Sequence, residues 1–121
     1  MKDLKEGEGR EDDNGKVYEG SFRADQKDGK GKLTTKSGEV YEGEFHKNFY
    51  HGRGTFTSDN KNVYSGDWLY GNLVVGEIAY HNKQKYFGQI NPQKQRQDYG
   101  VLYNADGTTQ FQGSLYLTRA F

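Results

Sequence analysis

The sequence predicts an all-β fold, an elongated single-layer curled antiparallel sheet of stacked β-hairpins. A pentapeptide with a large apolar residue at each end and a glycine at its centre recurs five times, at intervals of 22 to 25 residues. Within each copy the residues alternate with the period of two that is typical of a strand. No segment of ten or more residues shows the apolar period of a helix. Because no helix is available to cover the sheet, we expect the sheet to curl over its own apolar face.

The pentapeptide predicts the first strand of each unit. Its five copies are Tyr18–Phe22, Tyr41–Phe45, Tyr64–Trp68, Tyr86–Ile90 and Phe111–Leu115. In the second copy Tyr41, Gly43 and Phe45 share one face of the strand, whereas Glu42 and Glu44 share the other. Each unit therefore presents one aromatic face and one charged face.

A second motif, two glycines separated by one residue and followed by an apolar residue, predicts the other strand of each unit. It is complete at Gly29-Lys30-Gly31 and at Gly52-Arg53-Gly54, and later units keep only the second glycine. A glycine within a strand costs roughly 0.5–1 kcal/mol, so we expect a ring from a neighbouring strand to fill each gap. The signature positions of the repeat are Tyr18, Gly20, Phe22, Gly29, Gly31, Tyr41, Gly43, Phe45, Gly52, Gly54, Tyr64, Gly66, Trp68, Gly76, Tyr86, Gly88, Gly100, Phe111 and Gly113.

Turn residues separate the predicted strands and set the domain boundaries. Residues that tolerate a positive φ occur at Asn14-Gly15, Ser37-Gly38, residues 60–62, Asn82-Lys83 and Asp106-Gly107. We predict one repeat domain over residues 15–121, with four to five repeats of 22–25 residues. Residues 1–14 are highly charged and are predicted to form a flexible N-terminal segment.

These motifs closely resemble the MORN repeat, named for membrane occupation and recognition nexus. The units that begin at Tyr18, Tyr41 and Tyr64 match its pattern well, whereas those at Tyr86 and Phe111 carry an aliphatic residue in the second aromatic position. The resemblance implies hairpins stacked into a bent sheet with a groove, and a binding or scaffolding role without catalysis. It also implies partner peptides, a second copy of the chain, and phosphoinositide or phosphatidic acid as ligands to consider.

Composition excludes several classes of function. The chain has 121 residues, no net charge and no cysteine, so we expect no nucleic-acid partner, no disulfide and no thiolate chemistry. His51 occupies a position that Asp28 holds in the preceding unit, so the repeat does not require imidazole there, and we interpret His46, His51 and His81 as surface residues. The carboxylates recur with the strand period of a solvated face. We therefore predict no catalytic residue, no metal site, no cofactor and no enzyme activity.

Two sets of residues are candidates for binding. Phe49 and Tyr50 fall in the expected connection before His51, and with Tyr70 they are predicted partner contacts. A basic strip is the candidate for anionic lipid headgroups and comprises Lys83, Lys85, Lys94 and Arg96.

The leading hypothesis is a non-catalytic scaffold or interaction module that binds a partner peptide, or a second copy of itself, through a groove or a sheet edge. One alternative is a peripheral tether for anionic phospholipids, and another is a regulatory fragment of a larger enzyme. We expect an intracellular, cytoplasmic location, with the cytoskeleton, the cilium and the membrane surface as further sites that the resemblance suggests.

Overall fold

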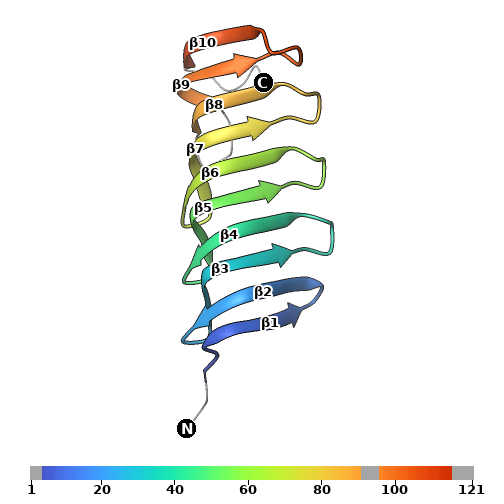
Figure 1. The fold of residues 1–121 in the computed structure, drawn as a ribbon, viewed down its shortest axis with the longest axis vertical. Helices are drawn as coiled ribbons and strands as arrows, with labels where there is room; N and C mark the ends of the chain where they lie inside the picture. The colour runs from blue at the N-terminus through green and yellow to red at the C-terminus, as the bar shows by residue number, and fades with distance from the viewer. Residues whose placement is uncertain (1–3, 91–95, 116–121) are drawn as a thin grey trace.

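The computed structural model describes residues 4–90 and 96–115, and within these ranges the chain is all β. Ten strands form one antiparallel sheet in which each strand pairs with its neighbours along the chain (Figure 1). The strands are β1 Gly7–Asp13, β2 Lys16–Arg23, β3 Gln26–Thr34, β4 Val40–His46, β5 Phe49–Thr57, β6 Val63–Leu69, β7 Asn72–Ala79, β8 Lys85–Ile90, β9 Arg96–Tyr103 and β10 Thr109–Leu115. The described residues include no helix that is long and apolar enough to cross a membrane.

The sheet is elongated, open and uncurled, with β1 and β10 at opposite ends of the column (Figure 1). The all-β sheet of hairpins is confirmed, whereas the predicted curl is wrong. The physical reason is that the rings cover one another along the column. The Tyr18 ring centroid lies 5.0 Å from those of Phe22 and Phe45, each time edge to face. The apolar face is therefore buried without the sheet closing over it.

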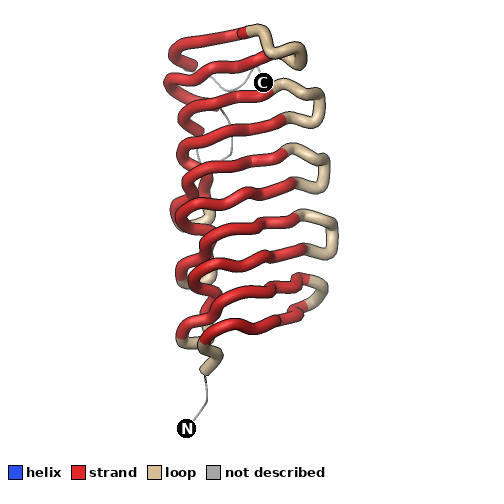
Figure 2. Tube along the Cα trace, viewed as in Figure 1, coloured by secondary structure: helices blue, strands red, loops and turns tan. Residues whose placement is uncertain are grey.

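The connections are short turns of two kinds. Longer loops at 35–39, 58–62, 80–84 and 104–108 lie along one side of the column (Figure 2). Two-residue turns at 14–15, 24–25, 47–48 and 70–71 join β1 to β2, β2 to β3, β4 to β5 and β6 to β7, and both residues of each turn have a positive φ. This is the geometry of a type I′ turn, which matches the twist of the flanking strands. Successive turns stack, because Asn48 N donates to Lys27 O and Gly71 N donates to Tyr50 O.

The N-terminal segment differs from the prediction. Residues 7–13, expected to be flexible, form β1 and pair with β2 from Gly7↔Phe22 to Asp13↔Lys16. Sequence reasoning missed this strand because Glu11 stands where later units have Leu33 or Phe56. The repeat sheet therefore begins before residue 15.

One glycine from every strand lies in a single row across the sheet. In strand order, the row is Gly9, Gly20, Gly31, Gly43, Gly54, Gly66, Gly76, Gly88, Gly100 and Gly113. The tyrosine rings of β2, β4 and β8 cover the glycines at Gly31, Gly54 and Gly100. At Gly43 and Gly66 an added Cβ would instead meet the backbone of the next strand. The ring-over-glycine prediction thus holds for the tyrosines at these three positions, whereas close backbone approach explains Gly20, Gly43, Gly66 and Gly76.

The aromatic face forms the core. Its fully buried side chains include Tyr18, Tyr41 and Tyr86, each less than 2% exposed. Each of these phenols donates a hydrogen bond to the backbone oxygen three residues later, at Ser21, Glu44 and Gln89 respectively. The hydroxyl is therefore satisfied although the ring is buried.

Burial also changes the titration of these phenols. It raises the pKa of Tyr18 to about 12, and the carboxylates of Glu8 and Asp28 add to the increase. Burial likewise raises the pKa of Tyr41, with Glu44 as the next contribution. A buried phenolate is unfavourable because it loses hydration near fixed negative charge.

We expect the protein to lose stability between about pH 10 and pH 12. The pKa of Tyr18 is higher in the folded state than the ordinary value of about 10, so the stabilisation is complete below pH 10 and is lost as the pH rises through 12. The Tyr18→Phe substitution should lower the free energy of unfolding by about 1 kcal/mol at pH 7, since one hydrogen bond is lost. Above pH 10 the stability of this variant should fall less steeply than that of the unmodified protein. Urea unfolding across this range measures both curves, and parallel curves would contradict the burial argument.

Candidate interaction surfaces

Three exposed apolar side chains gather at the two-residue turns between β4 and β5 and between β6 and β7. Phe49, Leu69 and Tyr70 are each about half exposed, at 49%, 50% and 49%. We call these three residues the aromatic edge. The rings of Phe49 and Tyr70 meet edge to face with centroids 5.7 Å apart. The structure thus joins two predicted contact residues that lie 21 positions apart in the sequence.

Backbone geometry holds the aromatic edge in place. Tyr70 is the first residue of its turn, with φ of 45°, and Gly71 follows at 89°. The backbone N–H of Tyr70 donates to His51 Nδ1 over 3.2 Å, and the two rings lie 4.6 Å apart. A ring fixed by its turn and by a neighbour loses little conformational freedom when a partner covers it.

A pocket of about 360 Å³ lies beside the aromatic edge. Its lining includes the rings of His46, His51 and Tyr70 and the carboxylates of Asp28 and Glu44. His46 Nδ1 lies 3.2 Å from Asp28 Oδ2, and Glu44 Oε1 accepts a hydrogen bond from the backbone of Arg53. The pocket therefore offers aromatic surface next to acceptor oxygens, a combination that suits a partner side chain with an apolar stem and a polar end.

Tyr50 does not belong to this surface. It was predicted as a contact residue in a connection, but Phe49 and Tyr50 are the first two residues of β5. The Tyr50 ring stacks on Tyr41 with centroids 3.9 Å apart and an interplanar angle of 8°. Alternation along the strand is the physical reason, because it turns Tyr50 toward the core while Phe49 stays exposed.

The charged face carries a groove floored by the glycine row. Its volume is about 640 Å³, and its floor includes Gly20, Gly31 and Gly43. Its walls are Glu8, Glu19, Lys30, Lys32, Glu42, Glu44 and Arg53. Opposite charges face each other across neighbouring strands, as at Glu19↔Lys32 and Lys30↔Glu44. The residues that line this groove have mixed charge, and no aromatic side chain is among them.

Of the four residues of the basic strip, the structure shows two, Lys83 and Lys85, near each other along the chain at the start of β8. Lys83 and Lys85 are exposed, and Lys85 lies on the same strand face as Phe87, which is 43% exposed. Lys94 lies outside the described residues, and Arg96 begins β9 opposite Ile90. Phe87 lies beside the basic strip in the sequence, and alternation from Lys85 places it on the outward face of β8.

The histidines of the described ranges do not belong to a cluster of metal ligands. No group of three or more histidine, aspartate or glutamate side chains within these ranges is placed to hold a metal ion. His46 and His51 lie together, with rings 5.4 Å apart, but they belong to the pocket beside the aromatic edge.

Comparison with known proteins identifies the repeat. The family model of the MORN repeat matches residues 18–40 and 41–63, two adjacent units. The resemblance inferred from the pentapeptides at Tyr18 and Tyr41 is confirmed over these residues. A search of curated proteins finds no match. MORN repeats are non-catalytic modules that generally mediate interaction with proteins or membrane lipids.

Proposed function

We propose, from the premise that residues 18–63 are two adjacent MORN repeats, that this chain is a non-catalytic interaction module for a protein partner. The observation that carries the proposal is the aromatic edge, where Phe49, Leu69 and Tyr70 are each about half exposed on two stacked turns. Exposed aromatic pairs beside a pocket are typical anchors of protein interfaces.

The amount of apolar surface is sufficient for an anchor. The exposed halves of two rings amount to roughly 150 Å², which at about 25 cal/mol per Å² corresponds to about 4 kcal/mol of gross burial. The partner segment then needs an apolar side chain to lie between Phe49 and Tyr70. A polar end that reaches Asp28 or Glu44 in the adjoining pocket would add specificity.

Photo-crosslinking tests the proposal. A benzophenone amino acid at position 70 should capture a discrete protein partner, whereas the same group at position 87 should not. The paired substitution Phe49→Ser and Tyr70→Ser should weaken binding of the captured partner by about tenfold or more. Phe87→Ser is the matched control, since Phe87 is a comparably exposed ring that lies on β8, several strands away from the aromatic edge. Equal capture from both positions would contradict the assignment.

The alternative of a peripheral lipid tether rests on Lys85 and Phe87, a basic and an aromatic side chain on one strand face. Such a pair suits an anionic interface, but each basic residue contributes only about 1 kcal/mol there. Vesicle binding by two single variants decides between the two functions. Salt-sensitive sedimentation with phosphoinositide vesicles that is lost on Lys85→Glu, and not on Tyr70→Ser, would favour the tether. A cytoplasmic, cytoskeletal, ciliary or membrane-surface location remains part of this proposal.

A further inference from the structure

The outer edge of β1 is available for pairing. Within the described ranges only β2 pairs with β1, and every residue of the strand except Glu11 is exposed. The two-residue turn at Asn14-Gly15 closes on the pair Asp13↔Lys16. In such a hairpin the closing pair exchanges hydrogen bonds, and bonded pairs then alternate with non-bonded ones. The backbone N–H and C=O groups of Glu8, Arg10 and Asp12 therefore point away from β2.

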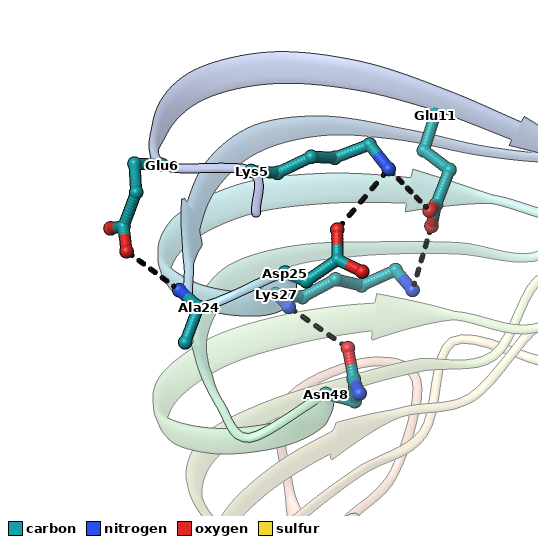
Figure 3. Close-up of polar contacts among 7 residues, drawn as sticks. All are labelled: Lys5, Glu6, Glu11, Ala24, Asp25, Lys27 and Asn48. Carbon is teal, nitrogen blue, oxygen red and sulfur yellow. Dashed lines mark hydrogen bonds and ion pairs between the residues drawn. The ribbon is translucent and has the colours of Figure 1, made fainter. Parts of the chain in front are cut away.

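Side-chain contacts on both faces hold this edge in a strand conformation. On the charged face Glu8 accepts a hydrogen bond from Ser21, and Arg10 lies 3.9 Å from Glu19. On the aromatic face Glu11 lies 3.6 Å from Lys5 Nζ and 3.5 Å from Lys27 Nζ (Figure 3). A partner strand would therefore meet a preformed template, which lowers the entropy lost on pairing.

The neighbouring turn strengthens the same end of the sheet. Lys5 Nζ also lies 3.4 Å from Asp25 Oδ1, and the backbone N–H of Ala24 donates to Glu6 Oε1 (Figure 3). The two ammonium groups lie over the last rings of the core, Lys5 Nζ at 5.8 Å from the Phe22 centroid and Lys27 Nζ at 5.5 Å from the Tyr18 centroid. These contacts cover the aromatic face at this end of the sheet. A partner of β1 would therefore contact its outward backbone groups and its charged side chains.

Charge selects the kind of strand that can pair. Residues 7–13 carry four carboxylates, at Glu8, Glu11, Asp12 and Asp13, and one cation, at Arg10. A second copy of β1 in antiparallel pairing centred on Arg10 would set arginine against arginine and Glu8 against Asp12. Like charges directly opposite are destabilising, and acidic edges also repel acidic strands. A strand with basic side chains is complementary.

We infer that β1 binds an extended basic segment of a partner protein by strand addition, separately from the aromatic edge. The segment pairs its backbone with the outward groups of Glu8, Arg10 and Asp12. Its two basic side chains lie four residues apart, at i and i+4, opposite Glu8 and Asp12. An uncharged polar residue at i+2 lies opposite Arg10. Backbone pairing supplies affinity, and the spacing of charges supplies register.

A synthetic peptide tests the inference on the whole chain. The probe is acetyl-Lys-Val-Thr-Val-Lys-amide with a fluorophore, and the comparison peptide has glutamate in place of both lysines. The lysine peptide should bind with an affinity that falls as salt is added, and the glutamate peptide should not bind. Arg10→Pro removes an outward N–H without removing a bond to β2, so binding should weaken by about tenfold or more.

The controls separate the edge from the charge and from the aromatic edge. Arg10→Gln makes the strand more acidic in the same way as Arg10→Pro but keeps the N–H, so it should bind at least as tightly as the unmodified chain. Asp12→Lys should weaken binding without touching the outward backbone groups. Tyr70→Ser should leave peptide binding unchanged, which distinguishes this surface from the proposed function. Undiminished binding to Arg10→Pro, with its strand content intact by circular dichroism, would overturn the inference.

Discussion

Gly54→Ala should destabilise the protein by about 3 kcal/mol or more, at the upper end of what overpacking of a core costs. The added Cβ would lie 2.7 Å from Tyr41 Cε1 and closer still to the hydroxyl oxygen. The Tyr41 ring has no room to move aside, because it stacks on Tyr50 at 3.9 Å and its hydroxyl donates to Glu44 O. Gly54 has no left-handed φ, so the loss would report the close approach and not backbone strain.

Gly9→Ala is the matched control, since Gly9 belongs to the same glycine row but lies on the edge strand. Its added Cβ would meet only the Phe22 ring, at 3.2 and 3.4 Å, and Gly9 also lacks a left-handed φ. We expect its free energy of unfolding to change by less than about 1 kcal/mol. Urea unfolding of both variants measures the difference. Equal losses at the two positions would mean that the tyrosine ring does not set the requirement for glycine.

The repeat predicted most of the fold because its glycines and rings have a shared physical cause. Tyr41 needs a neighbour without a side chain, and Gly54 provides it, so neither residue can vary without the other. Such paired requirements fix strand phase even in units where other positions have changed, as at Tyr86 and Gly100. Spacing along the sequence is therefore enough to place the strands from β2 onward.

The first strand and the sheet's shape could not be predicted in the same way. β1 has no aromatic residue, and its core position is taken by Glu11, which is stabilised by Lys5 and Lys27 from other parts of the chain. An apolar pattern cannot reveal a strand that is held by ion pairs. The curl was predicted to cover the rings, but edge-to-face contacts such as Tyr41 with Phe45 already cover them.

Which side chains are exposed at the candidate binding surfaces depends on the exact residue at which a turn ends and the next strand begins. The turn at 47–48 ends directly before Phe49, which is therefore the first residue of β5. Alternation along the strand then exposes Phe49 and buries most of Tyr50. The sequence does not specify that boundary, because Lys47-Asn48 lacks the glycine found in the turns at Asn14-Gly15 and Tyr70-Gly71. The meeting of Phe49 with Tyr70 depends in turn on how successive turns stack, a long-range feature that local patterns do not contain.

Tyr41→Ala should cost about 3–5 kcal/mol, the usual range for removing a buried ring. Tyr41 is fully buried, and its ring contacts Phe45 at 5.0 Å, Tyr50 at 3.9 Å and Trp68 at 5.5 Å. These contacts join β4 to β5 and β6, so the truncation weakens the interfaces between neighbouring units as well as one unit. In a repeat protein such interfaces supply much of the stability, and thermal unfolding should show the loss as a large decrease in the midpoint.

Tyr64→Ala tests whether this loss follows from packing or from the repeat position alone. Tyr64 occupies the same position of the next pentapeptide but is half-buried. The ring contact found for it in the described ranges is with Phe56, at 6.0 Å. No ring of Tyr64 covers Gly76, whose added Cβ would meet the backbone of Ser65 and Gly66. We therefore expect a loss of about 1–2 kcal/mol. Equal destabilisation by Tyr64→Ala and Tyr41→Ala would contradict this explanation. It would mean that the importance of the first pentapeptide position does not come from ring contacts between units.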